Sequence, residues 1–352
     1  MNLRVLYLFA GARRKIYEEY KSGKTPGIDL VGFNHMAENG VTADFLENRL
    51  TEFFRKISFN LTQLPVFLHL HKYDVIFSGS GIFTLFLMKY VLRFTRPKWV
   101  IYNTYLTNLL KRNKKGLKAW IIRKAVFSAD AIVSPSLSQQ EFLKSQGLPD
   151  EKNFHDPYGI NYDFFNKAET EPAKSDRRYI LSSGRDIGRD YQTLIKAVDG
   201  LPVRLLIATL PRNLSDIADL PANVEVAHFN QEKMTALIKG ASFVVIPTIG
   251  EEHLVGSDCS GQYALLRSMA CGKAVITSER STLKEYFTSG KHGLTVKPQD
   301  VDELKKAIMQ LWNDPTKTNV MGRAAQEKIK NELTIEIFSK KLAHIFKEVM
   351  AH

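Results

Sequence analysis

A short polar loop, residues 258–262 (Asp-Cys-Ser-Gly-Gln), precedes an apolar run with the composition of a helix, residues 263–270. A loop that contains glycine and leads into a helix presents free backbone N–H groups and the positive end of the helix dipole. This arrangement is suited to binding a phosphate group. Because every connection from a strand to a helix has such a loop, this one alone indicates an anion site only weakly, and other residues must support it.

Positive charge is concentrated in the first part of the chain, where 157 residues hold 23 Lys and Arg against 13 Asp and Glu, whereas the remainder holds 26 against 24. Residues 75–129 contain no acidic residue, and aromatic and aliphatic side chains lie among the basic ones. The basic residues of this segment are Lys89, Arg93, Arg96, Lys98, Lys111, Arg112, Lys114, Lys115, Lys118, Arg123 and Lys124.

Such a segment is attracted to anionic lipid headgroups, at about 1 kcal/mol for each basic residue near the surface. One alternative is a solvated basic face on a packed pair of helices. A second is a surface for nucleic acid, which ranks last because no nucleic-acid motif accompanies the charge. An anionic membrane surface is therefore the partner that we expect for this segment.

The composition excludes several classes of protein. The chain has 352 residues, enough for two domains, of which 44% are hydrophobic and 24% are charged, as in globular proteins. No apolar run is long enough to span a bilayer, and the first ten residues lack the features of a secretory signal. The only cysteines are Cys259 and Cys271, which excludes a cysteine zinc site and a disulfide framework. We expect a cytoplasmic protein.

Strand and helix patterns alternate along the chain, as a parallel α/β sheet requires. In the first half, we expect strands at residues 3–9, 74–77, 99–102 and 129–134, with a possible strand at 29–33 and a helical pattern from residue 45 to Pro65. In the second half, we expect strands at residues 179–183, 203–209, 224–228, 243–247, 274–276 and 293–296. The sequence therefore predicts two Rossmann-like, doubly wound domains with a crevice between them.

Three segments follow from this pattern. The first domain is predicted at residues 1–165, and the polar run 166–178 begins the second domain, residues 166–333. A final helix, residues 334–352, is expected to pack back toward the first domain.

Several ordered motifs in the second half carry a family resemblance. Residues 182–194 read Ser-Ser-Gly-Arg-Asp-Ile-Gly-Arg-Asp-Tyr-Gln-Thr-Leu, and the Ser-Gly-Gln loop, Glu285-Tyr286 and residues 290–298 follow in order. In order and spacing they resemble the C-terminal donor-binding domain of retaining GT-B glycosyltransferases of the "group 1" family. The resemblance covers about residues 179–312. The first half is similar only in its order of strands and helices and in Gly159-Ile160-Asn161.

The resemblance implies a site for the diphosphate of a nucleotide-sugar donor, UDP- or GDP-linked, with no cofactor and no metal ion. It places Arg185 and Arg189 on the diphosphate as the catalytic cations. Fixed cations there stabilise the charge that builds on the leaving group, and guanidinium groups bind phosphate oxygens bidentately. The other donor contacts that it implies are Gly184, His228, Phe229, Asp258, Ser260, Gly261, Gln262, Arg267 and Glu285. The acceptor side is assigned to Gly11, Arg13 and Asn103.

Two positions depart from the family pattern. The family usually has two glutamates eight positions apart, one near the donor sugar and one on the ribose hydroxyls, and here these positions are Cys259 and Arg267. An arginine cannot accept hydrogen bonds from ribose hydroxyls. Arg267 therefore pairs with Asp258, reaches the phosphates, marks a different donor, or accompanies a loss of donor binding. The nearest substitute carboxylates are Asp258 and either Glu251 or Glu252.

No catalytic base is assigned in the first domain. Many relatives have a histidine near the end of the strand at residues 101–105, where this chain has Asn103, Thr104 and Tyr105. A retaining reaction on one face of the sugar needs no base beyond the leaving phosphate. Lesser candidates for a base are Asp29, His35 and Asp74.

From these observations we expect a retaining, metal-independent glycosyltransferase that moves a sugar from a nucleotide sugar to a lipid-linked or saccharide acceptor. We expect it to attach peripherally to the inner face of the membrane. Three alternatives stay open: a non-catalytic GT-B subunit that binds a nucleotide sugar or an anionic surface, a GT-B enzyme that acts on nucleic acid, and a sugar-nucleotide epimerase. The last is disfavoured because the chain shows no suitable pair of acid and base.

Overall fold

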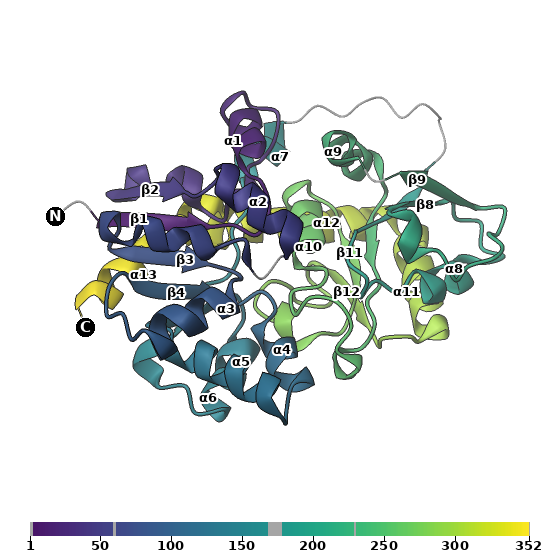
Figure 1. Cartoon of the computed structure of the whole chain (residues 1–352). Helices are drawn as coiled ribbons and strands as arrows, with labels where there is room; N and C mark the ends of the chain where they lie inside the picture. Colours follow the sequence, from purple (N-terminus) through teal and green to yellow (C-terminus); the bar gives the residue numbers. More distant parts are fainter. Residues whose placement is uncertain (1–2, 59–60, 168–177, 229, 352) are drawn as a thin grey trace. The chain divides into compact units, whose positions relative to one another are not determined.

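The computed structural model describes residues 3–58, 61–167, 178–228 and 230–351. The chain divides into two compact units. The first unit is Met1–Gly159 with Ile335–His352, and the second unit is Ile160–Thr334. The division falls before residue 165, where the sequence pattern had placed it, because α7 (Tyr162–Lys167) contacts α10 (Gln262–Ala270) of the second unit. The last helix, α13 (Ile335–Ala351), belongs to the first unit (Figure 1).

The first unit is built on a parallel six-stranded sheet in the order β2-β1-β3-β4-β5-β6. Its strands are β1 (Leu3–Leu8), β2 (Val41–Phe45), β3 (Val75–Ser78), β4 (Lys98–Tyr102), β5 (Ala131–Ser134) and β6 (Asn153–His155). Alternate side chains point to opposite faces of a strand. In β1, Val5 and Tyr7 join the core under α13, whereas Leu6 and Leu8 join the core on the opposite face.

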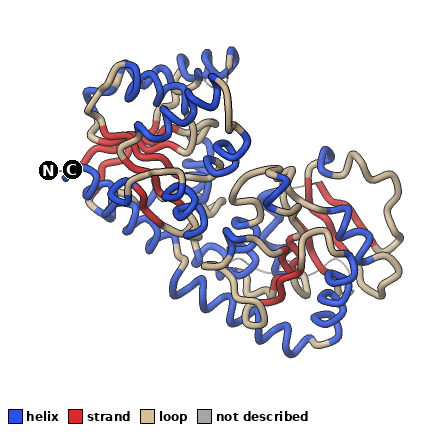
Figure 2. Tube along the Cα trace, turned by 90° about the horizontal axis from the view of Figure 1, so that it is seen from below, coloured by secondary structure: helices blue, strands red, loops and turns tan. Residues whose placement is uncertain are grey.

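The helices of the first unit cover both faces of this sheet, as Figure 2 shows for each unit separately. They are α1 (Arg14–Lys21), α2 (Arg49–Ile57), α3 (Ile82–Leu85) with a π-helical continuation (Phe86–Val91), α4 (Leu106–Arg112), α5 (Leu117–Ser128), α6 (Leu137–Ser145) and α13. Within the described residues, no helix combines the length and the apolar composition needed to cross a membrane.

Two predictions for residues 28–65 are wrong. Residues 29–33 do not form a strand: short 3-10 helices occupy Ile28–Leu30 and Phe33–His35, because Gly27 and Gly32 take φ of 70° and 77°, which interrupts an extended chain. In the described part of the range 45–65, the long helical pattern gives one α-helix, α2, which Asn48 and Thr51 begin with a capping box, and a 3-10 helix starts at Leu64.

The second unit has a parallel six-stranded sheet in the order β12-β11-β10-β7-β8-β9. Its strands are β7 (Ile180–Ser183), β8 (Leu205–Thr209), β9 (Val224–His228), β10 (Val244–Ile246), β11 (Val275–Ser278) and β12 (Gly293–Val296). Its helices are α7, α8 (Tyr191–Val198), α9 (Gln231–Gly240), α10, α11 (Val301–Asn313) and α12 (Pro315–Glu332). The predicted α/β class with two doubly wound sheets is therefore confirmed.

Strand order locates the binding crevice in each sheet. In an open parallel sheet, ligands bind at the carboxyl ends of the two strands where the direction of winding reverses. In the second unit these strands are β7 and β10, and in the first unit they are β1 and β3. The loops that follow these four strands are therefore the places to look for a site.

Candidate functional site

In the second unit, Asp186 joins the loop after β7 to the loop that precedes α10. Its Oδ1 accepts hydrogen bonds from the Gly188 N–H (2.7 Å) and the Ser260 hydroxyl (3.0 Å), and its Oδ2 accepts one from the Ser257 N–H (3.1 Å). A side chain at Gly256 would place its Cβ 2.1 Å from Asp186 Oδ1. The sequence analysis did not single out Asp186, which positions the two loops that carry the predicted phosphate ligands.

We expect Asp186→Ala to destabilise the protein by about 3 kcal/mol, since bonds to a charged acceptor contribute about 1.5–3 kcal/mol and three donors lose their partner. The corresponding fall in Tm, roughly 5–10 °C, is measurable by circular dichroism. Asp219→Ala, at an exposed aspartate of the same unit, is the matched control and should leave Tm unchanged. Equal Tm values for the two variants would contradict this role.

Arg189 is a buried cation at the end of β7, with only 6% of its surface exposed. Its Nη2 donates to the Ser183 carbonyl at 2.7 Å, while its Nε and Nη1 are buried and have no hydrogen-bond partner among the described residues. Gly184 makes room for this side chain, because a Cβ there would lie 2.3 Å from Arg189 Nε. Buried donors are normally satisfied, so the two unpaired groups indicate a place for an anionic ligand.

The charges around Arg189 are mostly of the same sign. Burial lowers the pKa of its guanidinium, Tyr191 and Asp186 raise it, and Arg267 and Arg280 lower it. A cluster of like charges is unfavourable in the absence of a counter-ion, and an anion that entered it would be bound by several cations at once. The cluster therefore has the electrostatic character of a diphosphate site.

Arg267 projects from α10 to the same strand end and is 2% exposed. Its Nη2 donates to Ser183 Oγ at 3.0 Å, and its guanidinium carbon lies 5.1 Å from the centre of the Tyr263 ring. Burial lowers the pKa of Arg267, Tyr263 and Cys271 raise it, and Arg185 lowers it. Arg189 and Arg267 thus bind the carbonyl and the hydroxyl of one residue, Ser183, which places two of the predicted cations together.

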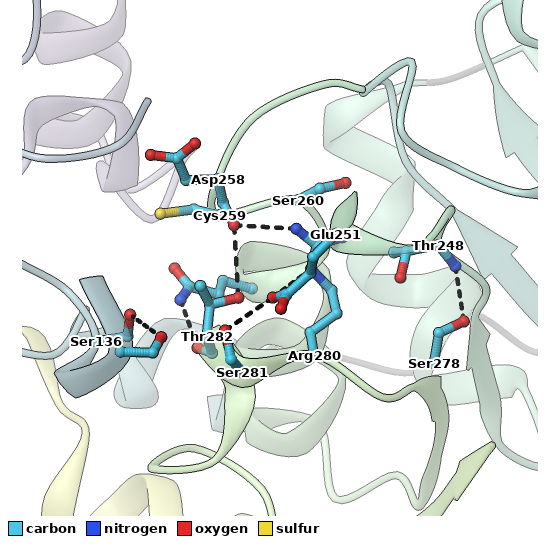
Figure 3. Close-up of polar contacts among 12 residues, drawn as sticks. Ser136, Thr248, Glu251, Asp258, Cys259, Ser260, Ser278, Arg280, Ser281 and Thr282 are labelled. Atoms are coloured by element: carbon cyan, nitrogen blue, oxygen red, sulfur yellow. Dashed lines mark hydrogen bonds and ion pairs between the residues drawn. The ribbon is translucent and has the colours of Figure 1, made fainter. Parts of the chain in front are cut away.

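Arg280 is a further buried cation, which the sequence analysis missed. It follows β11 and donates through Nη1 to the Ile249 carbonyl and through Nη2 to the Asp258 carbonyl, both at 3.2 Å. Its Nε lies 3.8 Å from Glu251 Oε1, which also accepts a hydrogen bond from the Ser281 hydroxyl at 3.1 Å (Figure 3). The one available signal was a basic residue just beyond the carboxyl end of a predicted strand.

A polar cavity of about 500 Å³ adjoins Arg280. Its lining includes Glu251, Ser278, Ser281 and Lys284. Glu251 was one of the substitute carboxylates proposed from the sequence, and the structure places it on this cavity. The other, Glu252, lies 3.3 Å from His253 Nε2, and Asp258 is anchored through its carbonyl, which accepts from Arg280 and Thr282.

The residues of the predicted phosphate loop make hydrogen bonds within their own unit. The Ser260 N–H donates to the Ser257 carbonyl and the Gln262 N–H to the Cys259 carbonyl, each at 3.1 Å. The Gln262 side chain donates to the Thr282 carbonyl at 2.8 Å. Gly261 begins α10 with φ of 91°. The contact between this loop and a phosphate stays a prediction. We now expect the contact to involve Gly261 together with the buried Arg189 and Arg267.

The remaining donor-side predictions lie at the periphery of this cluster. Arg185 is exposed and contributes to the electrostatics of Arg267. His228 is exposed at the end of β9, Cys259 and Glu285 are half-buried, and Phe229 lies outside the described residues. These assignments stay predictions.

The acceptor-side predictions lie in the first unit and have structural partners. Arg13 Nε donates to the Asp29 carbonyl at 2.9 Å, and Gly11 lies beside the Arg13 guanidinium. Asn103 is completely buried, its side-chain Nδ2 donates to Ser134 Oγ, and its side-chain Oδ1 accepts from the Leu106 N–H. An acceptor could reach Asn103 only if these bonds broke. The Asn103 assignment therefore gains no support from the structure.

Two of the lesser candidates for a base have side-chain partners: His35 Nδ1 lies 3.1 Å from Glu38 Oε2, and the Asp74 carboxylate accepts from the Arg4 N–H. The third, Asp29, is exposed, and its backbone carbonyl accepts from Arg13. Among the residues that the structure describes, no three His, Cys, Asp or Glu side chains are grouped as metal ligands.

The basic segment, residues 75–129, is partly neutralised by a carboxylate just outside it. Lys89 Nζ lies 2.7 Å from Asp130 Oδ2, and Lys98 Nζ lies 3.6 Å from its Oδ1. Lys111 lies over the Phe142 ring. Most of the other basic residues of the segment are exposed: Arg93, Arg96, Arg112, Lys114, Lys115, Lys118, Arg123 and Lys124. Of these, Arg112, Lys114, Lys115 and Lys118 lie on α4, α5 and the loop between them. The predicted basic face therefore loses Lys89 and Lys98 to Asp130 and keeps most of its exposed charge.

Residues 163–328 match the model of the family described as Glycosyl transferases group 1. This match lies within the second unit. The matched residues include Asp186 and the cluster formed by Arg189, Arg267 and Arg280. The protein is a glycosyltransferase.

Two relatives agree with this assignment. An uncharacterized glycosyltransferase of Methanocaldococcus jannaschii is 22% identical over 88% of this chain and 73% of its own length. A GDP-mannose-dependent monoacylated alpha-(1-6)-phosphatidylinositol monomannoside mannosyltransferase of Corynebacterium glutamicum is 26% identical over 54% of this chain and 55% of its own length.

Solved structures of other proteins share the fold over almost the whole chain. Sucrose-phosphate synthase from Thermosynechococcus elongatus has a TM-score of 0.72 at 15% identity and covers 99% of both chains. HepE of Anabaena, solved in complex with UDP-glucose, has a TM-score of 0.69 at 14% identity and covers 98% of this chain and 99% of its own. At this level of identity the likeness concerns the fold alone, and it confirms the predicted GT-B fold.

Proposed function

We propose that this glycosyltransferase moves a sugar from a nucleotide-sugar donor to an acceptor, with retention of configuration and without a metal ion. The observation that carries the proposal is the buried Arg189 guanidinium, two of whose donors are unpaired within a cluster of arginines. A diphosphate would satisfy these donors and neutralise the cluster. The structures of HepE with UDP and UDP-glucose support a donor of this class.

The proposed chemistry follows from where charge builds. As the bond between the sugar C1 and the phosphate oxygen breaks, negative charge collects on the leaving nucleoside diphosphate. Arg189, Arg185 and Arg267 stabilise that charge more in the transition state than in the ground state, which lowers the barrier. The acceptor oxygen forms its bond to C1 on the face that the phosphate leaves, and its proton passes to the leaving phosphate.

The donor is proposed to be UDP- or GDP-linked. HepE was solved with UDP-glucose, and the relative from Corynebacterium glutamicum is named for GDP-mannose. A panel of UDP- and GDP-sugars, screened by calorimetry for binding and by mass spectrometry for hydrolysis or transfer in EDTA, tests donor class and metal independence together. Binding without turnover would favour the non-catalytic subunit, which is suggested by Cys259 and Arg267 in place of the two family glutamates. An absence of binding to every nucleotide sugar would overturn the proposal.

The acceptor is proposed to be lipid-linked, and the protein to attach peripherally to the cytoplasmic face of a membrane. Support comes from the exposed basic residues of α4 and α5 and from the relative whose name includes a phosphatidylinositol acceptor. Apolar side chains are exposed beside them, with Leu117 at 74% and Trp120 at 44%. Basic and apolar side chains on one surface are typical of proteins that bind anionic membranes.

We expect the double variant Lys114→Glu/Lys115→Glu to bind vesicles with 30% phosphatidylserine at least about 30-fold more weakly, since each lysine contributes about 1 kcal/mol. Co-sedimentation at 0.1 M salt measures this. Lys305→Glu/Lys306→Glu, an exposed pair on α11, is the matched control and should bind as the wild type does. Salt-dependent binding to DNA without binding to vesicles would instead favour the nucleic-acid alternative.

A further inference from the structure

The first unit contains a cavity of about 980 Å³ at the carboxyl edge of its sheet. Ala10 beyond β1 and Gly79–Gly81 beyond β3 form its inner end, where the direction of winding reverses. Its walls are α3, α4 and the first turns of α5. The cavity therefore occupies the position in this sheet where an α/β domain binds a ligand.

The walls of this cavity are apolar. They include Ile82 and Phe83 of α3, Leu109 of α4 and Ile121 of α5. Leu117, at its edge, is 74% exposed, and Phe83 is 39% exposed. An apolar cavity of this size that opens beside exposed apolar side chains marks a binding site for an apolar group.

One positive charge stands in this lining, and further positive charge adjoins it. Among the described residues, Lys118 is the one charged residue that lines the cavity, and the exposed Lys114 and Lys115 lie in the loop between α4 and α5. No carboxylate occurs between residues 75 and 129, and Asp130 beyond them is bound to Lys89 and Lys98. The apolar space therefore adjoins a region that would attract an anion.

We propose that this cavity binds the hydrocarbon chain of a phosphate-bearing lipid, with the lipid phosphate against Lys118. The polar group attached to that phosphate would then point toward Ser80 and the strand ends. This inference rests on the proposed function, because it identifies the lipid as the acceptor of the sugar. The cavity would be a specific site for the hydrocarbon chain of the lipid. The acceptor would then be selected by this hydrocarbon chain as well as by the sugar or polyol that it carries.

Calorimetry of the full chain with hexyl, octyl and decyl phosphate, each below its critical micelle concentration, tests the cavity. The affinity should rise about three- to fourfold for each added methylene, since each buried methylene contributes about 0.8 kcal/mol. Inorganic phosphate should bind far more weakly than decyl phosphate. Lys118→Met should weaken the binding of decyl phosphate and leave the binding of decanol unaffected, because it removes the charge and keeps an unbranched side chain of similar length.

Two variants separate the cavity from general adsorption. Ile121→Trp narrows the cavity at the wall that α5 forms and should lower the affinity for decyl phosphate roughly tenfold or more. Leu117→Gln changes an exposed side chain, so the variant should fold normally. It should lower the affinity for decyl phosphate about fivefold. The matched control is Ile57→Gln, at a 57% exposed residue of α2 that does not line the cavity, and it should bind as the wild type does.

The inference would be overturned if the affinity did not depend on the length of the alkyl chain. It would also be overturned if Leu117→Gln, a well-folded Ile121→Trp and the control all bound decyl phosphate with equal affinity. Binding of a UDP- or GDP-sugar by the wild type, measured in the same instrument, reports on the proposed function separately. If the chain binds nucleotide sugars but not alkyl phosphates, the cavity proposal fails and the transferase proposal stands. If it binds alkyl phosphates but no nucleotide sugar, the lipid site stands and the transferase proposal fails.

Discussion

Arg189→Ala should lower kcat/KM for the donor by about 10²–10³-fold, the loss that follows removal of a donor that stabilises a developing anion. Two of the three guanidinium nitrogens of Arg189 are buried without a partner among the described residues, and the third donates to the Ser183 carbonyl, which holds the guanidinium in place. The side chain is therefore already fixed before the donor binds. A preorganised cation requires little rearrangement in the transition state, and this is why its removal should affect turnover so strongly.

Initial rates of donor hydrolysis or transfer, measured for the donor that the panel identifies, provide the test. Arg189→Lys keeps the charge but loses the bidentate geometry, so it should recover only part of the rate. Arg323→Ala, at an exposed arginine of α12, is the matched control. Thermal unfolding shows whether each variant is folded. A folded Arg189→Ala protein with wild-type kcat/KM would remove Arg189 from the reaction.

The sequence predicted the fold of both units because the information is local. Buried parallel strands appear as short apolar runs between helical patterns. The chain has such runs at β1, β3, β4 and β5, and at β7 to β12. The region from Ile28 to Asn39 could not be predicted in this way, since three short 3-10 helices and left-handed glycines carry the same apolar residues into the core.

The site could be predicted only in part, because its partners are distant in the sequence. Arg189 and Gly184 lie in one motif, but the bonds from Asp186 to Ser257 and Ser260 span 71 and 74 residues. Arg280 likewise binds carbonyls at Ile249 and Asp258. No local pattern encodes such contacts, which depend on the order of strands in the sheet.

The same limit applies to charge. The sequence showed an acid-free segment between residues 75 and 129, but the pairing of β4 with β5 and the packing of the π-helical segment bring Asp130 to Lys98 and Lys89. A count along the chain therefore included two charges that the fold neutralises. The exposed lysines of α4 and α5, next to an apolar cavity, could be recognised only once the helices were packed.

Arg267→Glu should have opposite effects on stability and on binding. The wild-type side chain is a buried cation beside Arg189 and Arg185, so part of its burial is unfavourable until an anion binds. A glutamate would pair with the remaining arginines, and we expect Tm to rise by a few degrees. The same pairing would occupy the anion site, and the affinity for UDP or GDP should fall about 100-fold. Functional sites often carry such a trade-off.

Calorimetry with nucleoside, nucleoside monophosphate and nucleoside diphosphate separates the possible roles of Arg267. If Arg267 binds phosphate, Arg267→Gln should lower the affinity for the nucleoside diphosphate about tenfold and leave the affinity for the nucleoside unchanged. Arg267→Glu should lower the affinity for the diphosphate further. If the position binds ribose, as the family glutamate does, both variants should change the affinity for all three ligands equally. A fall in Tm together with unchanged diphosphate affinity would mean that Arg267 only supports Ser183 and Tyr263, and the cation cluster would then consist of Arg185, Arg189 and Arg280.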